Sequence, residues 1–203
     1  MKLLYGTANP AKLKHMREML QGLDIEIIGL KDVDIKVDSI DENGNNPLEN
    51  AKIKAIAYYK AAKMPVFSCD TGLYIEGLYE KRQPGVHVRR VNGKTLNDEQ
   101  MIEYYTSIAS QLGGTAVAKY KNAICLVMDE NSVYEYDGED ISSEKFLITT
   151  KVHKMRDKGF PLDSISIDIK TKKYFIDLKA NSQDKDERNM AYSFKQFFKK
   201  SIY

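Results

Sequence analysis

Hydrophobic residues in the first half of the chain alternate between strand-like and helix-like spacing. Residues 2–6, "KLLYG", are apolar enough for a short buried strand, and Asn9 and Pro10 are typical of the cap and first position of a helix that ends near Gly22. The same analysis predicts a strand at "IEIIGL", a polar loop at "DVDIKVDSIDENGNN", a helix opening at Asn46 and Pro47, a strand "MPVFSC" that ends at Asp70, and a turn at "DTGL".

The second half of the chain is richer in strand patterns. A third helix is predicted from about Asn97 to Leu112, and a final helix places Met190, Phe194 and Phe198 toward the core. Between them we expect a long hairpin from "TAVAKYKNAICLVMD" and "SVYEYDG", and further strands at "EKFLITTKV", "SISIDI" and "KKYFIDL". Helices and strands that alternate first and hairpins that follow predict an α/β protein with a mixed sheet.

Composition narrows the class of protein. The chain has 203 residues, which suits a single domain over residues 1–203, and its net charge of +2 argues against broad nucleic-acid binding. Cys69 and Cys125 lack CxxC spacing and the three histidines are far apart, so we expect neither a disulfide framework nor a zinc site. With no long apolar run and no signal-peptide pattern, we expect a cytoplasmic protein that does not bind membranes.

The first predicted helix begins in a way that suits an anion. A helix N-terminus carries unpaired N–H groups and the positive end of the helix dipole. Thr7 can add a hydroxyl donor, Asn9 an amide donor and Lys12 a full charge one turn into the helix. The segment can therefore bind phosphate, although taken alone a capped helix with a solvated Lys12 explains the same residues.

Two acidic segments follow. Asp41 and Glu42 precede Gly44, and Glu49 lies on the next helix, so a cation among these carboxylates would relieve their repulsion. Asp70 follows an apolar strand, and a carboxylate at a strand end of an α/β sheet lies where ligands usually bind. A solvated acidic loop and a turn-forming aspartate remain the alternatives.

In combination these segments resemble the inosine triphosphate pyrophosphatase family, the non-canonical purine nucleoside triphosphate pyrophosphatases, over nearly the whole chain. The first four of six matched segments are the most informative because they occur in order and at near-family spacing. The matched segments are "TANPAK" (Thr7 to Lys12), "DENGNNPLENA" (Asp41 to Ala51, with Lys54 beyond it), "CDTGL" (Cys69 to Leu73), "PGVHVRR" (Pro84 to Arg90), "GFPLD" (Gly159 to Asp163) and "ER" (Glu187 and Arg188).

The resemblance implies a long twisted mixed sheet flanked by helices, two lobes with an active-site cleft between them, and a homodimer. It implies hydrolysis of a nucleoside triphosphate to the monophosphate and pyrophosphate with Mg2+. Glu42 and Asp70 would bind the metal, and Asp70 would also be the catalytic residue that orients or deprotonates the attacking water. The substrate-binding residues that it implies are Thr7, Asn9, Lys12, Lys54, Thr71, Arg90, Phe160, Asp163, Glu187 and Arg188.

The chain departs from the family pattern at a few positions. Ala8 replaces a glycine, which matters only if that position needs positive φ, and Cys69 replaces an acidic residue of the family turn. Pro161 and Leu162 replace a glycine and an aromatic residue, so we expect the base pocket to lose one aromatic contact.

The largest departure is Glu187, where the family has a histidine that donates toward a 6-keto oxygen. A carboxylate accepts hydrogen bonds and donates none unless protonated, so an acceptor here predicts a shifted or relaxed base preference. A slipped alignment explains Glu187 equally well, and Lys179 and Lys185 are both alternatives for the lysine that the family has before it.

Two other functions are compatible with the sequence. The first is a non-catalytic nucleotide-binding or sensing protein on the same fold, against which the retention of Glu42, Asp70 and Lys12 speaks. The second is nucleic-acid binding through "FKQFFKK", but its phenylalanines recur at core spacing and its lysines suit a solvated face.

Overall fold

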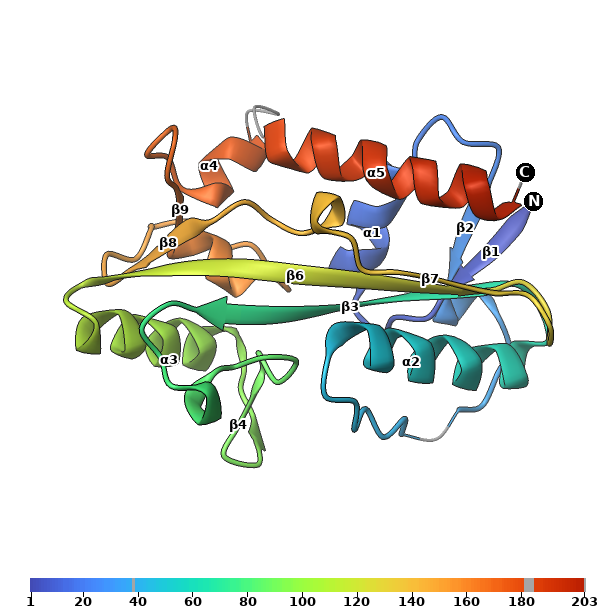
Figure 1. Ribbon diagram of the computed structural model, residues 1–203, viewed down its shortest axis with the longest axis horizontal. Coiled ribbons are helices and arrows are strands. Elements are labelled where there is room, and N and C mark those ends of the chain that lie inside the picture. The colour runs from blue at the N-terminus through green and yellow to red at the C-terminus, as the bar shows by residue number, and fades with distance from the viewer. Residues whose placement is uncertain (38, 181–184, 203) are drawn as a thin grey trace. The chain divides into compact units, whose positions relative to one another are not determined.

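A mixed β-sheet organises the chain in the computed structural model, which describes residues 1–37, 39–180 and 185–202 and, within them, not the side chains of residues 180 and 185–187 (Figure 1). Its seven strands are β1 (Lys2–Tyr5), β2 (Glu26–Gly29), β3 (Val66–Ile75), β6 (Thr115–Val127), β7 (Val133–Tyr136), β8 (Phe146–Thr149) and β9 (Ser166–Asp168). The order is β2-β1-β3-β6-β8-β9, with β7 paired to β6. Strand β1 is parallel to β2 and β3, whereas β6 is antiparallel to β7 and β8, which confirms the mixed α/β sheet.

Helices flank this sheet. They are α1 (Pro10–Met19), α2 (Pro47–Ala62), α3 (Asp98–Gln111), α4 (Phe175–Ala180) and α5 (Lys185–Ile202), and a separate two-stranded ribbon consists of β4 (Arg90–Val91) and β5 (Lys94–Thr95). In the described part of the chain, no helix combines the length and the apolar character that crossing a membrane requires.

The chain forms two compact units. The first unit comprises Met1–Thr71, Lys121–Ser142 and Arg188–Tyr203, and the second comprises Gly72–Tyr120 and Ser143–Glu187. Two units agree with the expected pair of lobes, while the cleft and the single-domain assignment stay predictions.

The first unit buries apolar side chains on both faces of its strands. On one face, α1 and α5 cover β1 and β3 (Figure 1). In this core Phe67 stacks on Tyr5 with ring centroids 4.6 Å apart and meets Phe198 edge-on at 5.0 Å. On the other face, Ala51 and Ala55 of α2 pack against β6. Phe194, Phe197 and Phe198 are all buried, which confirms that the phenylalanines of "FKQFFKK" are core residues.

The second unit has its own core. It consists mainly of the buried stripe of α3 and the inward-facing residues of β3, β6 and β8. Its largest buried members are Leu73, Ile75, Tyr105, Ile108, Phe146 and Ile148.

The predicted end of a strand at Asp70 is wrong. Strand β3 continues through Asp70 and Thr71 to Ile75, so "DTGL" is strand and not turn. The strand continues because Leu73 and Ile75 are buried in the core of the second unit, and burial of apolar side chains outweighs the local turn propensity of Asp-Thr-Gly. Asp70 is therefore held by strand geometry in the middle of a ten-residue strand.

Two further differences occur in short segments. The strand predicted at "KKYFIDL" is wrong, because only Tyr174 bridges to Ile167 and the chain then forms α4, with Phe175 packed 5.0 Å from Phe146 between ring centroids. The ribbon β4–β5 was not predicted, although Asn92 and Gly93 at its turn both have positive φ, the pattern of a tight hairpin turn.

Gly6 determines how closely β1 approaches the neighbouring segments. Its N–H donates to Phe67 O at 2.8 Å, and a Cβ at this position would lie inside van der Waals contact of Ser68 Oγ and Tyr58 Cδ2. Ala8, two residues on, is exposed, and positive φ among the described non-glycine residues occurs only at Lys63, Asn92 and Lys172. The alanine that replaces the family's glycine is thus free of backbone strain.

We expect Gly6→Ala to lower the free energy of unfolding by about 1–3 kcal/mol, because the added methyl overpacks a filled site. Urea unfolding followed by circular dichroism measures the change. Ala8→Gly is the control and should change stability by no more than about 1 kcal/mol. Equal effects of the two substitutions would contradict the close approach at Gly6.

Candidate active site

A lysine ammonium joins two carboxylates in the first unit. Lys54 Nζ, on α2, lies 2.6 Å from Asp70 Oδ1 and 3.2 Å from Glu42 Oε2. The three side chains are 12%, 10% and 29% exposed, so solvent screens their charges only in part. Burial alone would lower the pKa of Lys54, but the carboxylates of Asp70 and Glu42 together raise it. Lys54 is therefore a stable cation at neutral pH.

Asp70 keeps one oxygen unused. Oδ1 accepts from Lys54, while Oδ2 is buried and has no hydrogen-bond partner among the described residues. A buried carboxylate oxygen without a partner is costly unless a ligand binds it. Oδ2 is thus the atom of this site that most requires a ligand.

The carboxylates of Asp70 and Glu42 fit a hard divalent cation in chemistry and number. Mg2+ prefers oxygen ligands, and in phosphate-transfer sites it is commonly bound by one or two carboxylates, with waters and substrate phosphates completing the shell. Within the described residues, no group of three or more His, Cys, Asp or Glu side chains is arranged to hold a metal by itself. A cation at Asp70 and Glu42 would therefore depend on phosphate oxygens for the rest of its ligands.

The first turn of α1 lies in the same electrostatic environment. Asn9 caps the helix, with Oδ1 accepting from Ala11 N at 2.9 Å, and Thr7 Oγ1 accepts from Asn9 N at 3.2 Å. Among the hydrogen bonds of the described residues, none uses the Thr7 hydroxyl hydrogen or the side-chain NH2 of Asn9 as a donor. Burial lowers the pKa of Lys12, the Lys54 ammonium lowers it further, and Asp70 and Glu42 act in the opposite direction. The structure thus brings Lys12, Lys54, Asp70 and Glu42 together.

Thr71 makes a different contact from the predicted phosphate contact. Its Oγ1 donates to Asn122 Oδ1 at 2.8 Å, and Asn122 Nδ2 donates to Ile141 O at 2.7 Å. The single hydroxyl hydrogen is thus used within the protein. Asn122 was missed by the sequence analysis, and the signal that could have found it is an amide directly before the apolar run "AICLV" of the hairpin strand.

Cys69 belongs to the opposite side of β3 from Asp70. It packs against the core that α1 and α5 cover, and its thiol hydrogen-bonds with the Tyr5 hydroxyl. Burial raises the pKa of the Cys69 thiol to about 12. This residue therefore contributes a neutral thiol where the family has an acid.

Glu49 does not join the predicted carboxylate cluster. Its carboxylate accepts from Asn45 N at 2.7 Å and from Asn46 Nδ2 at 2.8 Å, while Asn46 Oδ1 caps α2 by accepting from Glu49 N. The Oδ1 atom of buried Asn50 accepts from Gly44 N at 2.9 Å, and a Cβ at Gly44 would lie too close to the side chains of Asn50 and Glu49. These contacts shape the loop that carries Glu42, and they use the Glu49 carboxylate within the start of α2.

A second group of predicted residues meets in the second unit. Lys179 Nζ lies 2.5 Å from Asp163 Oδ2 and 4.0 Å from the ring centroid of Phe160. The structure thus connects two residues of "GFPLD" with Lys179, one of the two lysines that the sequence left as alternatives. Leu162 is 4% exposed and packs in the core of this unit, so the position where the family has an aromatic residue is a core position here.

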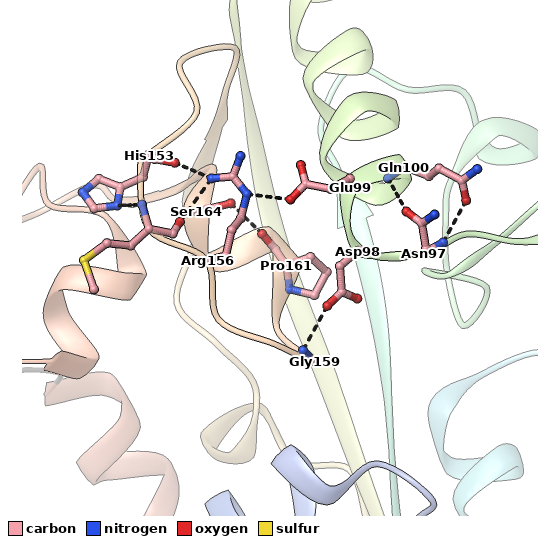
Figure 2. Close-up of polar contacts among 10 residues, drawn as sticks. Asn97, Asp98, Glu99, Gln100, His153, Arg156, Gly159, Pro161 and Ser164 are labelled. Carbon is pink, nitrogen blue, oxygen red and sulfur yellow. Dashed lines mark hydrogen bonds and ion pairs between the residues drawn. The ribbon is translucent and has the colours of Figure 1, made fainter.

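Acidic residues at the start of α3 fasten the segment that carries Phe160 (Figure 2). Asp98 Oδ2 accepts from Gly159 N at 3.2 Å, and Glu99 Oε1 accepts from Arg156 Nε at 2.9 Å. The Arg156 guanidinium also donates to His153 O at 2.5 Å. Residues 153–160 are therefore attached to the helix start by both main-chain and side-chain contacts.

Two predicted arginines are exposed, and two further predicted residues have side chains that the structure does not describe. Arg90 is exposed on β4, while its neighbour Arg89 binds Asp98 Oδ1 at 2.9 Å and Leu96 O at 3.0 Å, so Arg89 is the structural arginine of "PGVHVRR". Arg188 is exposed on α5. The side chains of Glu187 and Lys185 lie outside the described residues.

The sequence is similar to that of a known protein family and of several of its members. A model of the Ham1 family matches residues 3–188. The dITP/XTP pyrophosphatase of Porphyromonas gingivalis is 32% identical over 138 residues, 68% of this chain and 69% of that protein. The dITP/XTP pyrophosphatase of Leptospira interrogans is 32% identical over 149 residues, 71% of this chain and 72% of that protein.

Solved structures agree in fold. A HAM1 protein from Coxiella burnetii superposes with a TM-score of 0.72 at 23% identity, covering 98% of this chain and 99% of that one. The Ham1 protein of Staphylococcus aureus superposes with a TM-score of 0.71 at 21% identity, with the same coverage.

We expect both thiols to resist alkylation in the folded protein, because the thiolate is the reactive form and burial raises the pKa of Cys69 and of Cys125 to about 12. At pH 8 the reaction with iodoacetamide should be at least about a thousandfold slower than for the unfolded chain, whose cysteines titrate near their ordinary pKa. Mass spectrometry of native and urea-unfolded protein measures both rates. Rapid labelling of native Cys69 at pH 8 would contradict its assignment as a half-buried thiol that stays neutral at this pH.

Proposed function

The chain belongs to the Ham1 family, and from this premise we propose that it hydrolyses purine nucleoside triphosphates with deaminated bases, such as ITP, dITP and XTP, to the monophosphate and pyrophosphate. The names of its relatives support this substrate class. The observation that carries the proposal is the half-buried group of two acids and two lysines in the first unit, in which Asp70 Oδ2 has no hydrogen-bond partner within the described part of the chain.

The side chains of this group and of the start of α1 have separate roles in the hydrolysis of the triphosphate. Lys12 and Lys54 provide positive charge for the oxygens of the triphosphate, and Thr7 and Asn9 provide neutral donors at the start of α1. Asp70 Oδ2 accepts a proton from the water whose oxygen attacks the α-phosphorus. As that P–O bond forms, the bond between the α-phosphorus and the bridging oxygen breaks, and pyrophosphate leaves.

We assign Glu42 and Asp70 as the residues that hold Mg2+. When bound, the metal neutralises negative charge on the phosphate oxygens and lowers the pKa of the attacking water. Thr71 contacts a phosphate only if its hydroxyl turns away from Asn122, so we assign it chiefly to the positioning of the strand beside Asp70.

For the base we propose Phe160, Asp163 and Lys179 of the second unit, together with Arg188, as the recognising residues. The ring of Phe160 is half-buried beside Lys179, whose Nζ lies 4.0 Å from the ring centroid, and an aromatic ring can stack on a purine base. Asp163 is 7% exposed and paired with Lys179, so its carboxylate is positioned before a ligand arrives. Arg90 stays an exposed residue that we assign to substrate contact on the resemblance alone.

The resemblance also leads us to propose a homodimer that works in the cytoplasm. Both cysteines are free, which suits a reducing compartment. Size-exclusion chromatography with light scattering decides between a monomer and a dimer.

We expect Asp70→Asn to lower kcat by about 10²–10⁴-fold, because the amide neither accepts the water's proton nor binds a metal as a carboxylate does. Nucleotide affinity should change far less, since the two lysines remain. Pyrophosphate release from ITP and nucleotide binding by calorimetry measure the two effects. Asp140→Asn is the control, because the exposed Asp140 carboxylate accepts from the hydroxyls of Tyr136 and Ser193 and belongs to none of the contacts described around Asp70.

Absence of turnover in the unmodified protein, with nucleotide binding intact, would overturn the hydrolase assignment in favour of a sensing protein. Full activity of Asp70→Asn would overturn the role given to Asp70.

Base preference tests the hypothesis on Glu187. An acceptor in place of the family's histidine predicts that ITP and XTP are favoured over ATP and GTP less strongly than a donor would allow. Comparing kcat/KM across these four triphosphates measures the preference, and Glu187→His should raise the ratio of ITP to ATP. An exclusive preference for ITP and XTP in the unmodified protein would contradict the hypothesis.

A further inference from the structure

Lys54 lies where a cation between Glu42 and Asp70 would lie. Its single Nζ is within 3.2 Å of an oxygen of each carboxylate, and no other atom joins the two acids among the contacts described above. The ammonium therefore does for this pair of carboxylates what a bound metal ion would do, since it neutralises them and keeps them close.

The charge of the site disfavours a free metal ion and favours a metal ion that is bound to a triphosphate. Glu42 and Asp70 contribute two negative charges, and Lys12 and Lys54 contribute two positive charges close enough to act on one another. A divalent ion that arrives alone leaves this half-buried group with two excess positive charges, at a cost that incomplete screening makes large. A divalent ion that arrives on a triphosphate brings oxygens to which both ammonium groups can turn.

We propose that Lys54 is a positioning residue that acts as an internal counterion: its ammonium holds Glu42 and Asp70 together until a divalent cation–triphosphate complex arrives, and then moves to the phosphates. The site thus selects the metal–nucleotide complex over the free metal ion. This inference rests on the proposed function, because it takes Glu42 and Asp70 as the metal-binding pair.

The chain offers a matched control on the same helix. Lys52 is also on α2 and also forms an ion pair, at 2.7 Å from Glu135 Oε1, but neither partner belongs to the group around Asp70. A lysine whose role is only to stabilise α2 would behave like Lys52. A counterion at the metal position would not.

The test measures binding of Mn2+ alone, without nucleotide and without turnover, by electron paramagnetic resonance. Lys54→Gln should bind free Mn2+ at least about tenfold more tightly than the unmodified protein, because the competing charge is gone. Lys52→Gln and Lys54→Arg should bind it as weakly as the unmodified protein does. Unchanged or weaker binding by Lys54→Gln would overturn the inference.

Thermal unfolding gives a second readout that does not depend on affinity measurements. Without metal, Lys54→Gln should unfold at a lower temperature than Lys52→Gln, and Mn2+ should raise its midpoint more than it raises that of the unmodified protein. If Lys54→Gln folds only when Mn2+ is present, the inference is supported; if Mn2+ restores nothing, it is overturned. Pyrophosphate release by the unmodified protein tests the hydrolase assignment separately, so the two can fail independently.

Discussion

The arrangement of the first unit depends on neutralising two carboxylates that lie within reach of one ammonium. Asp70 is only 10% exposed in its side chain and Glu42 29%, so neither charge can rely on water. Removing one partner from such a group leaves an uncompensated charge that typically costs about 3–5 kcal/mol when fully buried and less here. Helix α2, the loop before it and the middle of β3 must therefore keep their relative positions, because Lys54, Glu42 and Asp70 each come from a different one of them.

The geometry of β3 gives Cys69, Asp70 and Thr71 different contacts. Successive side chains of a strand point to opposite faces, so Asp70 faces Lys54 while Cys69 faces the core with Tyr5, and Thr71 reaches Asn122. A turn at this position would have released all three side chains toward solvent. Because β3 continues to Ile75, the backbone holds the Asp70 side chain in its buried position. Asp70 Oδ2 therefore stays buried although it has no hydrogen-bond partner among the described residues.

The second unit prepares its polar residues in a similar way. Asp163 is buried beside Lys179, and Lys179 lies over the ring of Phe160. The Lys179 ammonium thus holds both the Asp163 carboxylate and the Phe160 ring in place. Asp98 and Glu99 hold the preceding segment through Gly159 and Arg156 (Figure 2). In both units a lysine ammonium pairs with a buried aspartate, which fixes the orientation of the carboxylate before any ligand binds.

Local patterns in the sequence determined most of the helices and strands, the caps at Asn9 and Asn46, and the family, because periodicity, capping chemistry and motif spacing act over a few neighbouring residues. They failed where distant packing outweighs local preference, as in β3 beyond Asp70 and in α4. Only the tertiary structure decided that Lys54 joins Glu42 to Asp70 and that Lys179 meets Asp163. Those outcomes depend on which long side chains come within about 3 Å across separate elements, a distance that no spacing along the chain encodes.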